Sequence, residues 1–435
     1  MKLWIGQTIS VFGSLIGATA MGFTAILILR ATPFQLGLLS AARLAPGFLT
    51  GLVAGAWVDR LRRRPILIGA DIARALLLAT IPLAAALGLL RIEQLYAVTL
   101  LVSILTIFFD VAYQSYLPSL IGRAELVDGN SKLSASASVA EVSAFGLSGW
   151  LVQLFTAPIT ILIDAISFIF SAISVWLIRA PEQAAAYNAQ PNLRGEIAEG
   201  LTAVRDHPFL RATAACTLSQ KFFSGIFSTL AVLYMVRDLG FAPGILGTIW
   251  AVGGVSSLVG AVVAAPTTRR FGIGPAMIVG LFLSGIALFF IPLAQGATLT
   301  AALLLVLQQT AGDGAATIYE INQVSLRQAI TPERLLGRVN ATTEFLGLAA
   351  TLAGSLLGGL LGEMIGVRAS LFLGAAGTLL SALWLVFSPV RALRGGSRPS
   401  CRTRTLKPTA EHRWERPELI IRAYAETVAT LLARK

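Results

Sequence analysis

Long apolar runs separated by short polar loops make up most of the chain. A helix needs about 20 apolar residues to cross the hydrocarbon core of a bilayer, and runs of about this length recur along the sequence. They occupy residues 3–29, 34–58, 66–90, 94–113, 134–155, 157–178, 210–236, 243–265, 274–294, 299–321, 339–365 and 367–388. The pattern predicts an all-α polytopic membrane protein with twelve transmembrane helices in two pseudo-symmetric sets of six.

A polar segment between the sixth and seventh runs indicates how the chain is divided. We expect an N-terminal six-helix bundle over residues 1–179, a cytoplasmic linker over 180–209, a C-terminal six-helix bundle over 210–389 and a basic cytoplasmic tail over 390–435. Residues 193–201 of the linker have weak amphipathic spacing and predict one surface helix, followed by a break at His207-Pro208. The first apolar run follows Lys2 like a signal peptide, but it is too long for one, and we interpret it as the first transmembrane helix.

The composition supports a membrane protein and excludes other classes. Only 13% of the 435 residues are charged and 55% are hydrophobic, with a mean hydropathy of +0.76, whereas soluble domains carry roughly 25% charged residues. This hydrophobicity excludes a disordered chain, and two cysteines exclude a disulfide scaffold.

The net charge of +12 is explained by topology and not by nucleic-acid binding. If the N-terminus is cytoplasmic, the inside segments before the tail contain sixteen Lys and Arg residues, while the outside loops contain only Arg30, Arg91, Arg237 and Arg368. Basic residues are retained on the cytoplasmic side of membrane proteins. We therefore expect a multi-pass plasma-membrane protein with both termini in the cytoplasm, and no nucleic-acid partner.

The two halves of the chain align when one is shifted by 210 residues. Polar or turn-forming residues then pair: Gly37 with Gly247, Arg60 with Arg270, Pro65 with Pro275, Asp110 with Glu320 and Asn130 with Asn340. Apolar matches would arise by chance in a membrane protein, but these pairs lie at equivalent points of the predicted topology. Duplicated six-helix units are typical of several transporter architectures, in which the substrate site lies where the repeats meet.

The loop between the second and third runs carries a recognisable motif. It reads Gly55-Ala56-Trp57-Val58-Asp59-Arg60-Leu61-Arg62-Arg63-Arg64. A glycine here lets two helices approach closely, an aspartate can end its helix and pair with a basic group, and arginines favour the anionic leaflet. A short cytoplasmic loop attracts arginine in any case, but it does not need a glycine four residues before an Asp-Arg pair. The segment matches the G-x-x-x-D-R-x-x-R-R loop and so resembles the major facilitator superfamily, which implies a conformational role for Gly55, Asp59, Arg60, Arg63 and Arg64.

Further stretches resemble the drug:proton antiporters of that superfamily, which include macrolide-efflux and enterobactin-exporter proteins. These stretches are residues 70–76, 108–118, 163–168, 322–328 and 336–339. The resemblance covers residue 3 to about residue 389, and it implies a two-bundle facilitator fold with alternating access around a central cavity. It also implies export driven by proton entry. Antiporter branches usually carry a Gly-Pro pair in the fifth helix, where this chain has Gly146-Leu147-Ser148-Gly149.

Charged side chains at membrane depth are the candidate functional residues, because each costs at least about 2.5–3.5 kcal/mol to insert. In the family that the chain resembles, the first, fourth, seventh and tenth helices line the cavity. The resemblance therefore implies a group of candidates for substrate binding or proton coupling, namely Asp110, Lys221, Gln308, Gln309 and Asp313. It places a second group at the interface between the bundles, namely Arg43, Glu141 and Glu344.

Each of these charges also has a structural interpretation. Asp71 and Arg74 are three residues apart on one helix face, so we expect them to brace the motif loop. Asp110 could pair with the basic loops, and Lys221 and Glu141 could pair with each other because neither lies near a loop. We expect Asp164, on a peripheral helix, to be structural.

The sequence offers no catalytic, metal or nucleotide site. His207 and His412 are both expected in the cytoplasm, Cys216 and Cys401 are far apart, and no phosphate-binding Gly-x4-Gly-Lys loop occurs. We therefore expect no enzyme and no cofactor. The leading hypothesis is a monomeric secondary transporter that exports small amphipathic molecules, with protons as the coupling ion and membrane lipids around it. The alternatives are an importer or lipid-handling facilitator, and a non-transporting membrane sensor on the same fold.

Overall fold

The computed structural model describes residues 2–58, 61–120, 126–178 and 193–393, and this part of the chain forms helices joined by loops, without a strand. The first half contains α1 (Lys2–Phe23), the π-helical turn η1 (Thr24–Ile28), α2 (Pro33–Val58), α3 (Arg63–Ala86), α4 (Ile92–Leu120), α5 (Leu126–Phe155) and α6 (Ala157–Trp176). The linker contains α7 (Leu193–Asp206).

The second half repeats this order. It begins with α8 (Pro208–Leu233), the π-helical turn η3 (Tyr234–Asp238) and α9 (Pro243–Phe271), followed by α10 (Ile273–Leu288), which α11 (Phe290–Leu293) continues. The next span consists of α12 (Leu299–Gln308), the π-helical turn η4 (Gln309–Asp313) and α13 (Gly314–Ile330). The last elements are α14 (Glu333–Met364), α15 (Val367–Ser381), α16 (Leu383–Val386) and the 3-10 turn η5 (Pro389–Ala392). Within the described ranges, 8 helices are long and apolar enough to cross a membrane, and helical segments at the other predicted positions fit the twelve-span pattern.

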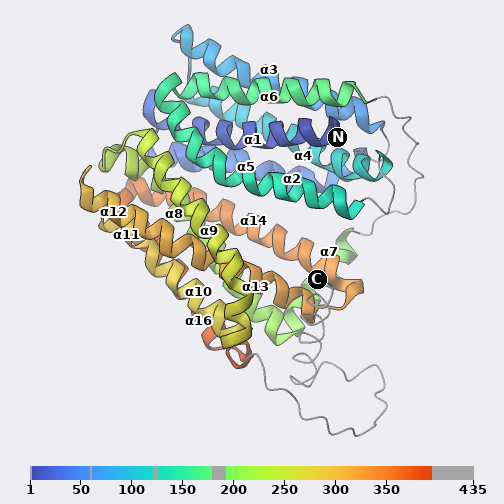
Figure 1. Ribbon diagram of the computed structural model, residues 1–435, viewed down its shortest axis with the longest axis vertical. Coiled ribbons are helices and arrows are strands. Elements are labelled where there is room, and N and C mark those ends of the chain that lie inside the picture. Colours follow the sequence, from blue (N-terminus) through green and yellow to red (C-terminus); the bar gives the residue numbers. More distant parts are fainter. Residues whose placement is uncertain (1, 59–60, 121–125, 179–192, 394–435) are drawn as a thin grey trace, which may run out of the picture.

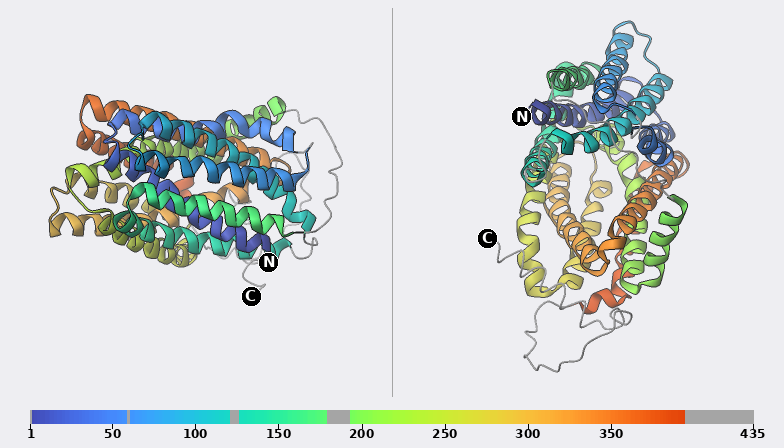
Figure 2. Two further views of the ribbon diagram at one scale, coloured as in Figure 1. Left: turned by 90° about the horizontal axis from the view of Figure 1, so that it is seen from above. Right: turned by 90° about the vertical axis from the view of Figure 1, so that its right-hand side faces the viewer.

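The helices form two groups that lie side by side (Figures 1 and 2). In the first group α1 packs against α5 and α6, and α3 packs against α4 and α6. In the second group α8 packs against α14 and α15, while α13 packs against α9 and α10. The outward faces of both groups expose large apolar side chains such as Leu154, Phe170, Val262 and Leu303, which suit contact with lipid and not with water.

The two groups meet through two pairs of helices, α2 with α14 and α5 with α9. The contacts in both pairs concentrate at one end of the molecule, which we call the crossing end. It is the end at which α2 and α9 begin and α5 and α14 finish. The opposite end carries the start of α1 and the linker helix α7 (Figure 1).

The repeat predicted from the sequence is present in the backbone with a shift of 210 residues. Pro33 and Pro243 begin α2 and α9, and Ala157 and Val367 begin α6 and α15. The π-helical turn η1 at Thr24–Ile28 has its counterpart in η3 at Tyr234–Asp238. Since even these irregular turns recur at the same offset, the two halves share one fold.

The linker helix α7 confirms the surface helix that the amphipathic spacing predicts. It lies against α14, where Glu199 pairs with Arg338 and, at 3.6 Å, with Arg334. Gly200 fits the two helices together, because a Cβ at this position would lie 2.4 Å from Thr342 Oγ1. The predicted break also occurs, since His207 and Pro208 open α8.

Candidate functional site

A central cavity of about 1220 Å³ lies between the two helical groups. Its walls come mainly from α1, α2, α4 and α6 on one side and from α8, α9, α12, η4 and α13 on the other, with single residues from α3, α5 and α14. Ligand pockets in proteins usually measure roughly 300–1,000 Å³. The cavity is therefore large enough for a drug-sized molecule together with water.

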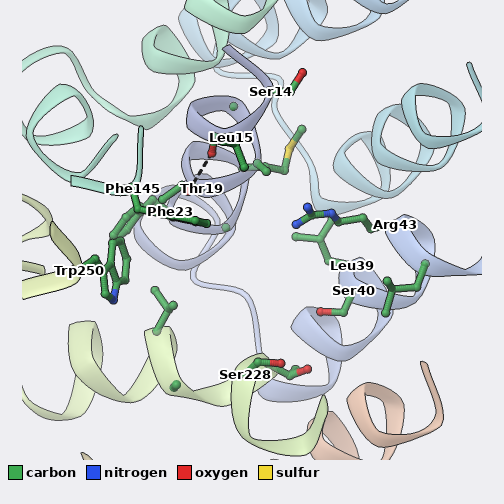
Figure 3. A pocket seen from close by; sticks show the side chains of 18 of the residues that line it. Ser14, Leu15, Thr19, Phe23, Leu39, Ser40, Arg43, Phe145, Ser228 and Trp250 are labelled. Atoms are coloured by element: carbon green, nitrogen blue, oxygen red, sulfur yellow. Dashed lines mark hydrogen bonds between the residues drawn. The ribbon is translucent and has the colours of Figure 1, made fainter. Parts of the chain in front are cut away.

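Aromatic side chains form one part of the cavity wall. Phe23 of α1 and Trp250 of α9 approach each other from the two groups, with ring centroids 6.0 Å apart. Phe145, Phe168 and Phe227 add further rings to the lining. Figure 3 shows Arg43 of α2 pointing into the cavity toward the side that Phe23, Phe145 and Trp250 occupy. The site thus combines a wide apolar surface with a few charged groups, an arrangement suited to amphipathic ligands.

The tenth predicted span supplies a polar wall, as expected from the sequence. Gln308, Gln309 and Asp313 all line the cavity. Gln309 and Asp313 belong to the π-helical turn η4, a distortion that commonly occurs at functional sites. The Gly312-Asp313-Gly314 segment is therefore a local irregularity of the helix at the cavity wall.

Two residues of α9 fix this turn. The Ser256 hydroxyl donates to Thr310 O at 2.6 Å and accepts from Gly314 N at 3.1 Å, so it satisfies one backbone group within η4 and one directly after it. The absence of a side chain at Gly253 leaves room for the Asp313 carboxylate and the Gln309 amide, since a Cβ at this position would lie 2.3 Å from Asp313 Oδ2 and 2.3 Å from Gln309 Nε2.

Three charged residues line the cavity although the sequence did not place them there. Arg43 was expected between the bundles and Asp164 on a peripheral structural helix, yet both belong to the lining. Glu320 of α13 also lines it, two helical turns beyond Asp313. The 210-residue repeat had paired Glu320 with Asp110, and this was the one sequence signal that pointed to it.

Other predicted candidates lie elsewhere. Asp110 and Lys221 are exposed side chains of α4 and α8 and do not belong to the cavity lining. Asp110 instead lies within electrostatic reach of Arg74. Glu344 is an exposed residue of α14 near Arg327. The side chain of Glu141 lies outside the described residues, so the proposed pairing of Lys221 with Glu141 stays a prediction.

Asp71 and Arg74 form the ion pair that their spacing suggests, and both are buried. The Arg74 guanidinium lies against the rings of Phe109 and Phe168, at 4.4 and 4.1 Å from their centroids, and bracing of the motif loop stays a prediction. It also donates to Thr106 Oγ1 at 3.3 Å. The pair therefore joins α3 to α4 and α6 within the first group of helices.

Much of the motif loop lies outside the described residues. This is the case for Asp59 and Arg60, and for the surroundings of Gly55 within α2. Arg63 and Arg64 begin α3, and Arg64 Nη2 donates to Trp176 O at the end of α6. The conformational role of the loop stays a prediction.

Glycines bring the two groups of helices together at the crossing end. In the α2–α14 pair, a Cβ at Gly359 would lie 2.8 Å from Pro33 O and 3.1 Å from Gly37 Cα. In the α5–α9 pair, a Cβ at Gly149 would lie 2.2 Å from Pro243 O and 2.8 Å from Gly247 Cα. The glycine spacing noted in the fifth span thus serves backbone-to-backbone packing.

A side-chain acceptor reinforces each of these crossings. Glu363 Oε1 of α14 accepts from the Thr32 hydroxyl and from Phe34 N at the start of α2. Gln153 Oε1 of α5 accepts from Gly244 N at the start of α9, at 2.8 Å. Arg237 Nη2 also donates to Ile26 O across the same end. The cavity is therefore separated from this end by close backbone packing and hydrogen bonds.

Comparison with known proteins shows which family model, relatives and solved structures this chain matches. The family model described as "Major Facilitator Superfamily" matches residues 3–348. The multidrug efflux pump Tap of Mycolicibacterium fortuitum is 26% identical over 368 residues, covering 81% of this chain and 87% of Tap. Macrolide efflux protein A of Streptococcus pyogenes is 23% identical over 257 residues, covering 56% of this chain and 63% of the relative. A bacterial homologue of the iron transporter ferroportin in its inward-facing state superposes with a TM-score of 0.69 at 17% identity, covering 88% and 97% of the two chains.

Proposed function

Because the chain belongs to the Major Facilitator Superfamily, we propose that it exports small amphipathic molecules by alternating access and that proton entry drives the export. Membership makes it a multi-pass membrane transporter of small molecules and not an enzyme. The finer proposal is supported by the relatives named as multidrug and macrolide efflux proteins. The observation that carries it is the large cavity with aromatic walls and isolated charges.

The chemistry of the cavity walls favours amphipathic substrates over small hydrophilic ones. The rings of Phe23 and Trp250 offer flat apolar contact, while Arg43 on one wall and Asp313 with Glu320 on the other offer charges of both signs. A drug-like, macrolide-like or siderophore-like molecule can satisfy both kinds of surface at once. A sugar or an inorganic ion would leave the apolar wall unused.

The orientation in the membrane defines which end must open for export. From the distribution of basic residues we expect the termini and α7 in the cytoplasm, so that the crossing end faces outward. The close-packed crossings then separate the cavity from the outside, as in an inward-facing state. Export requires this end to open while the opposite end closes, and the glycine crossings are the contacts that must separate.

Transport in everted membrane vesicles tests the proposal directly. In such vesicles the cytoplasmic face points outward, so an exporter carries ethidium or erythromycin into the lumen when the lumen is acidified. We expect accumulation that stops when nigericin collapses the pH gradient. Accumulation without pH dependence would contradict proton coupling. Binding of both probes without any flux would instead indicate a membrane receptor, and uptake in the opposite direction would indicate an importer.

A matched pair of tryptophan variants tests whether the aromatic wall binds substrate. Trp250→Ala removes a ring from the cavity, whereas Trp176→Ala removes one that is 64% exposed on the outer face of α6. We expect Trp250→Ala to weaken the apparent affinity for the transported probe by about tenfold, the scale of a lost aromatic contact. Trp176→Ala should leave it unchanged. Equal effects of the two substitutions on affinity would contradict the assignment of this wall.

A further inference from the structure

Three ionisable side chains, Asp71, Arg74 and Asp164, are buried inside the first group of helices, and a fourth, Asp110, lies beside them with its side chain exposed. Asp71 and Arg74 form a buried ion pair on α3, with side chains that are 0% and 3% exposed. Asp110 of α4 and Asp164 of α6 both lie within electrostatic reach of the same guanidinium. This part of the chain lies at membrane depth, where ionisable groups are costly and usually functional.

The charges of this cluster do not balance. It contains three carboxyl groups and a single guanidinium, and an arginine side chain keeps its proton in proteins. With Asp71 and Asp164 both ionised, one of the two buried negative charges would be left uncompensated in a medium of low dielectric constant, and the exposed Asp110 adds a third carboxylate near the same guanidinium. Interacting carboxyl groups in such surroundings relieve their repulsion by binding protons. The cluster is therefore suited to hold at least one proton.

Asp164 is the carboxyl group of this cluster that reaches the transport cavity. It belongs to the cavity lining and is only 5% exposed. The Ser14 hydroxyl donates to its Oδ1 at 3.3 Å, and the Ser167 hydroxyl, which donates to the Asp164 backbone carbonyl at 2.8 Å, lies 3.4 Å from the same Oδ1. Helix α1 passes directly over it, since a Cβ at Gly17 would lie 2.3 Å from Asp164 Oδ2. A proton can thus reach this carboxyl group from the cavity, while the neighbouring helices shield it elsewhere.

Among the described side chains of the surrounding helices, few groups can compete for that proton. The residues of α1 that face Asp164 are Gly13, Ser14 and Gly17, none of which titrates. The charged neighbour from α3 is Arg74, and behind it lie Asp71 on the same helix and Asp110 on α4. On α6 itself the contact is Ser167. Protonation of Asp164 therefore acts mainly on Arg74 and on Ser14.

We propose that Asp164 binds the coupling proton of this transporter, taking it from the central cavity and releasing it again to leave a carboxylate that the nearby Arg74 guanidinium stabilises. The proposal rests on the proposed proton-driven export and names the residue responsible. In the ionised state the carboxylate accepts from the Ser14 hydroxyl and lies within electrostatic reach of Arg74. In the protonated state it donates its own hydrogen, Ser14 can turn to accept it, and Arg74 is left to Asp71 and Asp110.

Arg74 distinguishes Asp164 from the carboxyl groups on the opposite wall. A coupling residue must be stable both with and without its proton, because it has to bind and release the proton in each cycle. The ionised form of Asp164 has a nearby cation and the Ser14 hydroxyl donor as partners. Asp313 has Glu320 as its charged neighbour, which repels its ionised form. Asp313 and Glu320 are better suited to meet a cationic group of the substrate.

Chemical labelling of the wild-type protein gives the first test. Dicyclohexylcarbodiimide reacts with protonated carboxyl groups in apolar surroundings, and peptide mass spectrometry locates the modified residue. In the full chain reconstituted in lipid, we expect labelling of Asp164 at low pH that decreases as the pH rises. Asp238, an exposed carboxyl group at the crossing end, is the internal control and should not show this labelling. Absence of label on Asp164 at every pH would overturn the proposal.

A neutral variant of the same shape gives the second test. Asp164→Asn should lower ethidium accumulation driven by a pH gradient by about tenfold or more. Ethidium counterflow without a gradient should stay near the wild-type rate. Asp238→Asn should retain both activities. Driven accumulation at the wild-type level in Asp164→Asn would contradict the proposal.

The two tests also separate this inference from the proposed function. If the wild type moves no ethidium under any gradient but Asp164 shows pH-dependent labelling, the export proposal fails and the proton site stands. If Asp164→Asn does not fold, Asp164→Ser offers a smaller neutral side chain for the same transport assay. Should neither variant fold, the labelling of the wild type decides alone.

Discussion

The two crossings between the helical groups are related by the internal repeat, yet they are built differently. Gly37 and Gly359 join α2 to α14, and their counterparts 210 residues away, Gly247 and Gly149, join α9 to α5. The α5–α9 crossing is the tighter one, with a hypothetical Cβ at Gly149 only 2.2 Å from Pro243 O, compared with 2.8 Å between Gly359 and Pro33 O. The wider crossing carries the charged acceptor Glu363, and the tighter one carries a neutral glutamine.

The difference indicates that the two crossings have different roles in keeping this end closed. At the α5–α9 crossing, backbone contact and an uncharged hydrogen bond hold the helices together independently of solution conditions. At the α2–α14 crossing, looser packing is supplemented by a carboxylate at a helix N-terminus, an interaction that depends on charge and salt. We therefore expect α5–α9 to act as the firmer contact and α2–α14 as the more responsive one when the cavity opens outward.

The largest expected effect comes from adding a single methyl group at the tighter crossing. Gly149→Ala places a Cβ against backbone atoms of Pro243 and Gly247 that cannot rotate away. We expect a loss of about 1–3 kcal/mol of stability, the usual cost of overpacking. Gly359→Ala should cost less because its nearest contact is wider. Thermal unfolding of the purified variants in detergent measures both losses.

Gly69→Ala is the matched control for these variants. Gly69 lies within α3, and a Cβ there would meet no atom within 4 Å. Since alanine favours helix over glycine, this variant should be as stable as the wild type or slightly more stable. Equal losses for Gly149→Ala and Gly359→Ala would contradict the distinction between a firm and a responsive crossing.

The next effect concerns the turn that follows each crossing. Thr156 and Gly366 occupy equivalent positions before α6 and α15 and have nearly the same backbone angles, with φ of 72° and 87°. Only glycine adopts this region without strain, and the Thr156 side chain makes no capping hydrogen bond. We expect Thr156→Gly to raise the stability by about 1 kcal/mol and Gly366→Ala to lower it by a similar amount.

Another threonine at the start of a helix is the control for this prediction. Thr298 has an ordinary φ of −101°, and its side chain accepts from Ala301 N. Thr298→Gly should therefore destabilise the protein slightly, the reverse of Thr156→Gly. If both glycine substitutions shift the thermal midpoint in the same direction, strain at Thr156 is not the cause.

The sequence predicted the fold well because its signals are local and repeated. Hydrophobic run length and the 210-residue repeat require no knowledge of tertiary contacts, and both were confirmed by the helices and by the paired turns η1 and η3. The linker helix was equally visible in its amphipathic spacing. The polar wall around Asp313 could be predicted because its residues lie on a span that lines the cavity in the family that the chain resembles.

The remaining site residues depend on helix rotation, which apolar sequence does not define. Arg43 and Asp164 line the cavity, whereas Asp110 and Lys221 do not. In a helix that is apolar on all sides, hydrophobic periodicity does not indicate which face points inward. Gly13 and Gly17 open α1 toward Asp164, and this contact could be identified only from the packing of the two helices.

The smallest expected effect separates the two acceptors at the crossings. Glu363 accepts from Phe34 N at 3.3 Å, and Gln153 accepts from Gly244 N at 2.8 Å, each at the first turn of a facing helix. A negative charge at such an N-terminus contributes about 0.3–1 kcal/mol at low ionic strength. Glu363→Gln should therefore make the α2–α14 crossing resemble its counterpart and shift the population toward the outward-open state by about two- to fivefold.

The reciprocal exchange, glutamine to glutamate at the α5–α9 crossing, tests the same difference in the opposite direction. Gln153→Glu adds a charge at the start of α9 and should favour the closed state by a similar factor. Both shifts can be measured in a chain whose two native cysteines are replaced and which carries Ser228→Cys in the cavity. The accessibility of this cysteine to an impermeant thiol reagent added outside reports the outward-open population.

Thr32→Ala removes a donor to Glu363 that has no equivalent at the other crossing, where Ala242 stands, and should open the closed end slightly. High salt should reduce the effect of Glu363→Gln because it screens exposed charges. An unchanged accessibility in both exchange variants would show that the glycine packing alone keeps this end closed.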